Sequence, residues 1–271
     1  MDDYSQVRYW VDELPKKGKT TFSLAEAEIQ FQSKPASSVS RALARLSESG
    51  KIFSVWKGFY AIALPEYGLV GTVPPMDYIS QLMCYLNTDY YIALLTAASY
   101  QGASHHAPQV LYVICNKDLR EKSKYKTKIE PAYKKSIQLN YISKINTRTA
   151  SVNISNPELT AVDLLAYVKR AGGINQVTTV LAELVESINF DDVNEDFFYS
   201  VPAAYIQRLG YLLEVELEEK EISESLYEKA MRSGVSFHTT TLVVDKGNQL
   251  EVLGRNKKWR LIVNYRIESD L

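Results

Sequence analysis

Residues 34–62 constrain the fold of this chain most, because a strongly amphipathic helical pattern is followed there by a short aromatic hairpin pattern. Four apolar residues recur at the i, i+3, i+4 and i+7 spacing of one buried helical face: Val39, Ala42, Leu43 and Leu46. The opposite edge carries Ser37, Arg41 and Arg45, which lie four residues apart and therefore align along the helix. The pattern predicts a helix with one apolar face and one serine- and arginine-rich face.

The ends of this helix and the hairpin after it also have sequence signals. Ser37 or Ser38 is expected to cap the free amides behind Pro35, and Gly50 is expected to end the helix in a left-handed conformation. Two β-type runs, Ile52–Val55 and Phe59–Ile62, are joined by a Lys57-Gly58 turn. A basic turn at the tip of such a ribbon can lie along a phosphate backbone.

Two further amphipathic helices, at Tyr4–Leu14 and Leu24–Phe31, and a short strand at Thr20–Phe22 precede this stretch. This order of elements predicts a winged helix-turn-helix domain at residues 1–64 that binds double-stranded DNA. Such modules also serve as protein-docking units, but an exposed edge of serine and arginine favours DNA. The predicted DNA-binding residues are Lys34, Ser37, Ser38, Ser40, Arg41, Arg45 and Lys57. The serines and arginines would face the major groove, and the two lysines would contact phosphates.

The charge of this domain is modest. Nine Lys and Arg against seven Asp and Glu in residues 1–64 leave about +2, which is weak for an independent DNA-binding domain. The acids fall mainly on the first two helices, so we expect a polarised domain of modest affinity. It would need a second copy or help from the rest of the chain.

Composition limits the other possibilities. The 271 residues suffice for two domains, and a net charge of −1 does not indicate any particular class of binding partner. Cys84 and Cys115 form no metal spacing, and His105-His106 with His238 make a poor ligand set, so neither a metal nor another cofactor is expected. No phosphate-binding glycine loop or nucleophile elbow occurs, and we expect no enzymatic activity. Without a signal peptide or membrane-spanning run, the sequence predicts a cytoplasmic protein with no membrane partner.

A proline- and glycine-rich linker at residues 65–77 separates the first domain from a larger mixed α+β domain at residues 78–271. Expected helices in this region are Met76–Leu86, Asp89–Gln101, Pro157–Val168, Gln176–Ser187, Asn194–Val201, Ala203–Glu214 and Glu221–Arg232. Expected strands are Val110–Asn116, Ser136–Tyr141, Ala150–Ile154 and Trp259–Ile267. Arg208 and Asp163 are expected to form a buried ion pair.

A basic segment at Lys117–Arg148 has a net charge of about +7. Its alternating lysines would share one face of an extended ribbon. One interpretation is a second polyanion contact through Lys122, Lys124, Lys126, Lys128, Lys134 and Lys135. The other is a solvated loop whose lysines only favour solubility. The sequence leaves both open.

Four sequence blocks in order resemble the AbiEi family of antitoxins. They are Tyr90–Ala98 with Gly102, Asn156–Leu165 with Gly172-Gly173, Gln207–Glu214, and Trp259–Asn264. The resemblance implies an N-terminal winged helix that binds inverted repeats in its own promoter and represses it. It also implies a C-terminal domain that counteracts a co-encoded nucleotidyltransferase-like toxin, in a type IV system that needs no stable complex.

Two alternatives remain open beside this autorepressor and antitoxin. In the first, the C-terminal domain binds the toxin directly and DNA binding is incidental. In the second, the chain is a ligand-sensing winged-helix repressor whose C-terminal domain binds a small metabolite.

Overall fold

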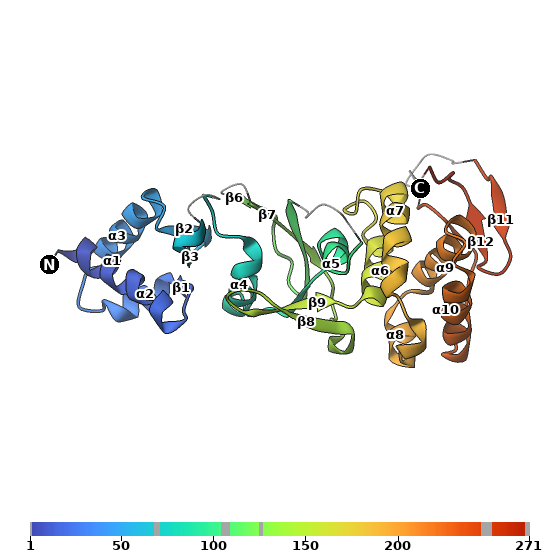
Figure 1. Ribbon diagram of the computed structural model, residues 1–271, viewed down its shortest axis with the longest axis horizontal. Coiled ribbons are helices and arrows are strands. Elements are labelled where there is room, and N and C mark those ends of the chain that lie inside the picture. Colours follow the sequence, from blue (N-terminus) through green and yellow to red (C-terminus); the bar gives the residue numbers. More distant parts are fainter. Residues whose placement is uncertain (1, 68–70, 104–108, 125–126, 245–250, 269–271) are drawn as a thin grey trace. The chain divides into compact units, whose positions relative to one another are not determined.

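The computed structural model describes residues 2–67, 71–103, 109–124, 127–244 and 251–268 (Figure 1). The chain forms two compact units, each built from several separate segments. The first unit comprises Met1–Tyr91, Gln109–Ile137 and Lys144–Asn153; the second comprises Ile92–Pro108, Gln138–Ser143 and Ile154–Leu271. The domain limits expected from the sequence, 1–64, 65–77 and 78–271, stay a prediction.

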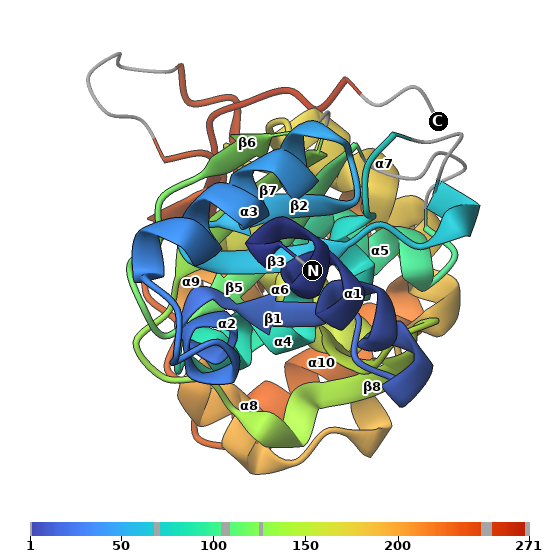
Figure 2. The ribbon, with the colours of Figure 1, turned by 90° about the vertical axis from the view of Figure 1, so that its left-hand side faces the viewer.

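The first unit begins with three helices and three strands, which we call the N-terminal module (residues 2–64). Its elements are α1 (Asp3–Glu13), β1 (Thr21–Ser23), α2 (Leu24–Gln30), α3 (Ala36–Glu48), β2 (Ile52–Trp56) and β3 (Phe59–Ile62). The strands form an antiparallel sheet in the order β1-β3-β2, which Figure 2 shows side by side. The predicted helices, short strand and hairpin are confirmed as elements.

The core of this module follows from the amphipathic patterns. The predicted apolar face of α3 is buried against Val7 and Val11 of α1, and Phe22 of β1 belongs to the same core. Trp10 of α1 packs edge-on against Phe22 at 5.1 Å between ring centroids. Burial of aliphatic and aromatic side chains on every element is what fixes α3 in this small module.

The start of α3 differs from the expectation. Pro35 is the N-cap residue and no side chain caps the helix. Because Ser37 and Ser38 already lie within the helix, their hydroxyls are not at the cap position. Gly50, by contrast, has the expected left-handed φ of 72°.

A six-stranded sheet follows, in the order β6-β7-β5-β4-β9-β8. Its strands are β4 (Tyr90–Ile92), β5 (Val110–Cys115), β6 (Lys122–Lys124), β7 (Thr127–Tyr133), β8 (Ile142–Asn146) and β9 (Ser151–Ser155). β5 and β7 pair in parallel, as do β4 and β9, whereas β6 and β7 are antiparallel. The division between the two units falls within β4, β8 and β9.

The helix expected at Met76–Leu86 is confirmed as α4 (Ile79–Tyr85), which begins three residues later. Two other expectations for this region were wrong. The helix expected at Asp89–Gln101 is the strand β4 followed by the short helix α5 (Leu94–Tyr100). All three residues of β4 are buried, so sheet pairing prevailed over helical periodicity there. The strand expected at Ser136–Tyr141 contains instead a 3-10 turn at Leu139–Tyr141.

The second unit is mainly helical. Its helices include α6 (Pro157–Ala166), α7 (Ile174–Leu184), α8 (Glu195–Ser200), α9 (Ala203–Tyr211) and α10 (Lys220–Arg232), with a π-helical turn at Leu212–Glu216. α6 packs against α5, α7 and α9, and α10 packs against α8 and α9. A small sheet is ordered β10 (Thr240–Thr241), β12 (Leu261–Val263) and β11 (Gly254–Asn256). The predicted α+β class is confirmed.

Trp259 is the largest fully buried side chain of this unit. Its ring packs against Tyr227 at 5.3 Å and Phe237 at 5.7 Å between centroids. On α9, the buried Gln207 donates from Nε2 to the carbonyl of Trp259 at 2.6 Å and to that of His238 at 2.8 Å. Gln207 therefore fixes two backbone segments against α9: the one just before β10 and the one between β11 and β12.

None of the helices in the described part of the chain is long and apolar enough to cross a membrane.

Candidate nucleic-acid interface

The solvent-facing side of α3 presents the residues that the sequence pattern placed there. Ser37, Ser40, Arg41 and Arg45 are exposed, and Ser38 is half-buried at the edge nearer α1. The Nε of Arg41 donates to the carbonyl of Ser37 at 3.2 Å, one turn earlier on the same helix. Arg45 lies over the ring of Tyr4, with 6.0 Å from the guanidinium carbon to the ring centroid. Both guanidinium groups keep donors free for an external acceptor.

The cations of the N-terminal module divide into two groups. Five are paired with acids of the same module: Arg8, Lys16, Lys19, Lys34 and Lys51. Of the cations that the structure describes here, those without an acidic ion-pair partner are Lys17, Arg41, Arg45 and Lys57. Internal pairing thus engages five of the nine cations, and three of the four that remain lie on the α3 edge and the hairpin turn; the fourth, Lys17, lies in the turn after α1.

Lys34, predicted to contact phosphate, is engaged elsewhere. Its Nζ lies 2.5 Å from Oδ1 of Asp3, and only 15% of its side chain is exposed. The hydrogen bond from Lys34 lowers the pKa of Asp3 below its usual value. Hydrogen bonds from Ser5 likewise lower the pKa of Asp2, with a smaller contribution from Arg45. Both carboxylates are therefore ionised at neutral pH.

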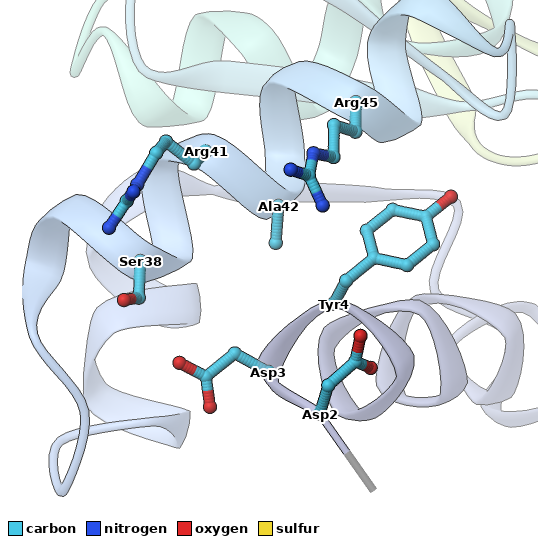
Figure 3. Close-up of a pocket in the computed structure, with 7 residues that line it drawn as sticks. All are labelled: Asp2, Asp3, Tyr4, Ser38, Arg41, Ala42 and Arg45. Atoms are coloured by element: carbon cyan, nitrogen blue, oxygen red, sulfur yellow. The ribbon is translucent and has the colours of Figure 1, made fainter.

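These acids lie beside the arginines of α3. Asp2, Asp3 and Tyr4 at the start of α1 and Ser38, Arg41 and Arg45 of α3 surround one open hollow of about 430 Å³ (Figure 3). The expected polarisation of the domain is incomplete, because α1 packs along α3 and the N-terminal end of α1 brings Asp2 and Asp3 beside the arginines of α3. A polyanion that approaches this face meets cations and anions together.

The backbone of the hairpin turn is held by hydrogen bonding and packing, whereas the side chain of Lys57 in this turn is exposed to solvent. The Lys57 side chain is exposed, while its carbonyl accepts a hydrogen bond of 3.2 Å from the hydroxyl of Tyr85 on α4. Phe59 packs against the same tyrosine at 5.1 Å between ring centroids. Gly58 adopts a φ of 72°, as the turn requires. The turn therefore presents one cation from an anchored backbone.

The basic segment does not form one extended ribbon, since the chain reverses between β6 and β7. Lys122 pairs with Ile129, and Lys128 pairs with Ser123. Neighbouring residues alternate in side and cross-strand partners share one, so positions 122 and 128 lie on opposite faces. Lys124 lies in β6 at the register of Thr127, and Lys126 lies outside the described residues. The expectation of four lysines on one face is wrong.

Several cations of this segment are already used within the first unit. Lys128 pairs with Glu121 at 3.4 Å and Glu130 at 3.0 Å. Lys122 lies over the ring of Trp56 at 4.9 Å, and Lys134 donates to the hydroxyl of Tyr91 at 3.1 Å. Lys135 is exposed. Because β7 is a sheet strand with a buried Ile129 and Ala132, the solvated-loop interpretation does not hold for residues 127–133.

Two other chemical expectations concern the second unit. The guanidinium of Arg208 donates to the carbonyl of Thr241 at 2.9 Å and to the hydroxyl of Thr240 at 3.4 Å. The expected ion pair with Asp163 is thus not formed among the described residues. No cluster of three potential metal ligands occurs in the described ranges, and the His105-His106 pair lies outside them.

Sequence reasoning missed the role of Asp2, Asp3 and Tyr4. The acids entered the charge count of the domain, but periodicity does not say which end of one helix meets which end of another. Asp2 is the N-cap of α1, and its Oδ1 accepts a hydrogen bond of 2.9 Å from the backbone N–H of Ser5. An aspartate at this position is a sequence signal that could have identified where the helix begins.

Comparisons with known proteins agree with this architecture. The family model of the AbiEi antitoxin C-terminal domain matches residues 91–215. The crystal structure of the RV2827C protein from Mycobacterium tuberculosis superposes with a TM-score of 0.65 at 13% identity, covering 97% of this chain and 92% of that one. This likeness concerns the fold alone.

A nucleotidyltransferase-like protein from Paracoccidioides brasiliensis superposes with a TM-score of only 0.33 at 13% identity, covering 55% of this chain and 89% of that one. So low a score carries no argument. No curated protein sequence matches the chain.

Proposed function

Since this chain belongs to the AbiEi antitoxin family through residues 91–215 and so has a toxin–antitoxin role, we propose that its N-terminal module is a winged helix-turn-helix that represses the chain's own promoter. In this proposal α3 enters the major groove of double-stranded DNA and the β2–β3 hairpin is the wing. The C-terminal domain counteracts a co-encoded nucleotidyltransferase-like toxin, and the chain acts by binding and not by catalysis.

The observation that carries the DNA proposal is the distribution of unpaired cations. Arg41 and Arg45 project from α3 without an acidic ion-pair partner in the described module, and Lys57 does so from the hairpin turn. A helix edge with arginines and a basic hairpin tip is the arrangement by which winged helices bind base edges and phosphates together. An apolar α3 edge would instead have favoured a protein partner.

The test is operator binding by an Arg41→Ala/Arg45→Ala variant, titrated on the DNA upstream of the gene. Each arginine that binds a guanine edge contributes about 1–3 kcal/mol, so we expect at least a thirtyfold loss of affinity, or about 2 kcal/mol. The matched control is Arg8→Ala/Lys16→Ala, which removes the same charge from exposed positions outside the α3 edge. Equal losses in the two variants would mean that α3 contributes only general charge.

The antitoxin half of the proposal is tested separately. The arginine variant should still neutralise the toxin when both are co-expressed from a foreign promoter. Loss of neutralisation in a variant that remains folded would contradict the assignment of the two roles to different parts of the chain. Stable co-purification of toxin and antitoxin would favour the alternative in which the toxin is bound directly.

A further inference from the structure

A second cavity lies wholly within the second unit. It occupies about 630 Å³, within the range of about 300–1,000 Å³ in which small-molecule sites fall. Its walls come from the end of α6 and the turn after it, from α9, and from the chain around residues 242–244 and 265. The polar and aromatic side chains at its walls are Tyr167, Lys169, Arg170, Tyr205, Arg208 and Tyr265. Aliphatic side chains make up most of the remaining surface.

The charge of the cavity wall is one-sided. Lys169, Arg170 and Arg208 line it, and no acidic side chain among the described residues does. Lys169 and Arg170 are exposed, whereas Arg208 is only 7% exposed. The cavity thus has one buried cation and two cations toward solvent.

Arg208 is unusual because it is buried without a counter-ion. Its Nε and one Nη donate to Thr241 and Thr240, which are neutral, and the other Nη has no acceptor among the described residues. Burial lowers the pKa of this guanidinium, but an arginine stays protonated at neutral pH. Burial of an unpaired charge is costly, and a buried cation is normally paired with an anion.

Aromatic rings accompany this cation. Tyr205, one turn before Arg208 on α9, has its ring centroid 5.7 Å from the guanidinium carbon. Tyr167 and Tyr265 contribute two more rings to the same cavity wall. Flat apolar groups pack favourably against such rings, and Arg208 can bind a carboxylate or phosphate with two parallel N–H donors.

We propose that this cavity binds a small aromatic anion, a phosphate or carboxylate joined to a planar ring, with the anion on Arg208 and the ring among the tyrosines. The inference is independent of DNA binding by α3. It assigns a ligand site to the C-terminal domain that would make the chain responsive to a metabolite.

The full-length protein is titrated by calorimetry with four probes. Adenosine 5′-monophosphate and indole-3-carboxylate carry both the ring and the anion, and they distinguish a nucleotide from an aromatic carboxylate. Adenosine and inorganic phosphate each carry one part. At least one of the two combined probes should bind with a Kd below about 1 mM, and more tightly than adenosine or phosphate. Absence of binding by both combined probes, or tighter binding of adenosine, would overturn the proposal.

Variants locate the site. Arg208→Met should lower the affinity for the bound probe at least about tenfold, because a charge-assisted hydrogen bond is lost. The affinity of Arg208→Lys should lie between those of the original protein and the methionine variant, since lysine keeps the charge without the planar guanidinium. If Arg208 has only a structural role, the methionine variant should melt at a clearly lower temperature without ligand. It should then bind the probe with the affinity of the original protein, which would contradict the proposal.

The exposed rim gives a test that does not depend on folding of the Arg208 variants. Lys169→Ala should lower the affinity for the anionic probe about two- to fivefold and leave the affinity for adenosine unchanged. The matched control is Lys257→Ala, which removes an exposed cation of the same unit that does not line the cavity. Equal effects of the two substitutions would contradict the site.

Discussion

Asp2 and Asp3 limit how strongly the basic edge of α3 can attract a polyanion. Asp3 holds Lys34, and Asp2 lies close enough to Arg45 for the arginine to lower its pKa. Both acids are exposed or half-buried at the rim of the hollow in Figure 3. In the proposed function, the affinity of the module for DNA therefore depends on opposing charges on α1 and α3, and substitution of the acids should change it.

Asp3→Asn should therefore strengthen operator binding. The substitution removes a repulsive charge and frees Lys34 for a phosphate, so the slope of log K against log salt should steepen by about 0.9 for the added contact. Filter binding at several salt concentrations measures both effects. Glu28→Gln is the control, since it removes one acid of α2 that does not line the hollow. An unchanged salt slope would show that Lys34 stays away from the backbone.

Glu158 gives a prediction about pH. Burial raises the pKa of this carboxyl above its usual value, although the backbone N–H of Asn189, 2.7 Å from Oε1, favours the ionised form. Above the ordinary glutamate pKa of about 4.3, the unfolded chain has released this proton while the folded chain still holds it. Linkage then makes the free energy of unfolding fall as pH rises through the interval up to the raised pKa.

The measurement is urea denaturation of the protein and of Glu158→Gln across this pH range. Relative to the variant, the original protein should lose stability as pH rises from about 4.3 and level off above the raised pKa. Any constant cost of the altered hydrogen bonds cancels, because only the pH-dependent part of the difference is compared. A constant difference, or one of the opposite sign, would contradict the raised pKa.

Among the elements, those with a single strong period were predictable and those shaped by sheet pairing were not. The face of α3 could be identified residue by residue because its four apolar positions repeat without interruption. Residues 90–92 belong to a run that fits a helix equally well, and only their partner strands make them β4. The lysines of β6 and β7 alternate in sequence, but the reversal between the strands lies beyond what alternation can show.

The contact between α9 and the loop before β12 explains a glycine that no pattern identified. A Cβ on Gly210 would lie 2.1 Å from the ring of Trp259, which is fully buried. Gly210→Ala should lower the free energy of unfolding by about 3 kcal/mol, because the helix or the buried ring must shift to accept the methyl group. Gly254→Ala should be nearly neutral, since open space surrounds that position.

A double variant checks that the cost comes from this one contact. Trp259→Phe removes part of the ring that meets the new methyl group, so Gly210→Ala should cost less in its presence than alone. Denaturant unfolding of the four proteins in this cycle gives the coupling between the two positions. Strictly additive costs would place the effect of the glycine elsewhere.

For the whole molecule, the sequence supplied the fold class and the family but not the distribution of charge. The count of about +2 for residues 1–64 is correct as a sum, yet internal pairing decides that Lys17, Arg41, Arg45 and Lys57 carry the unpaired charge and that Lys34 does not. The same holds for Arg208, for which an ion pair was expected and a cavity was found. Which charges neutralise each other depends on contacts distant in sequence, and composition contains no such information.

The order of segments along the chain has a consequence for inheritance. Beyond residue 91 the chain passes back and forth between the two units, and β4, β8 and β9 each contain the crossing. A crossover between genes within that region would therefore leave both units with strands of mixed origin. The N-terminal module, in contrast, is one continuous stretch with its own sheet and core, so recombination can exchange it whole. If the module binds an operator as proposed, operator preference can change between relatives while residues 91–215, which match the antitoxin domain, pass on intact.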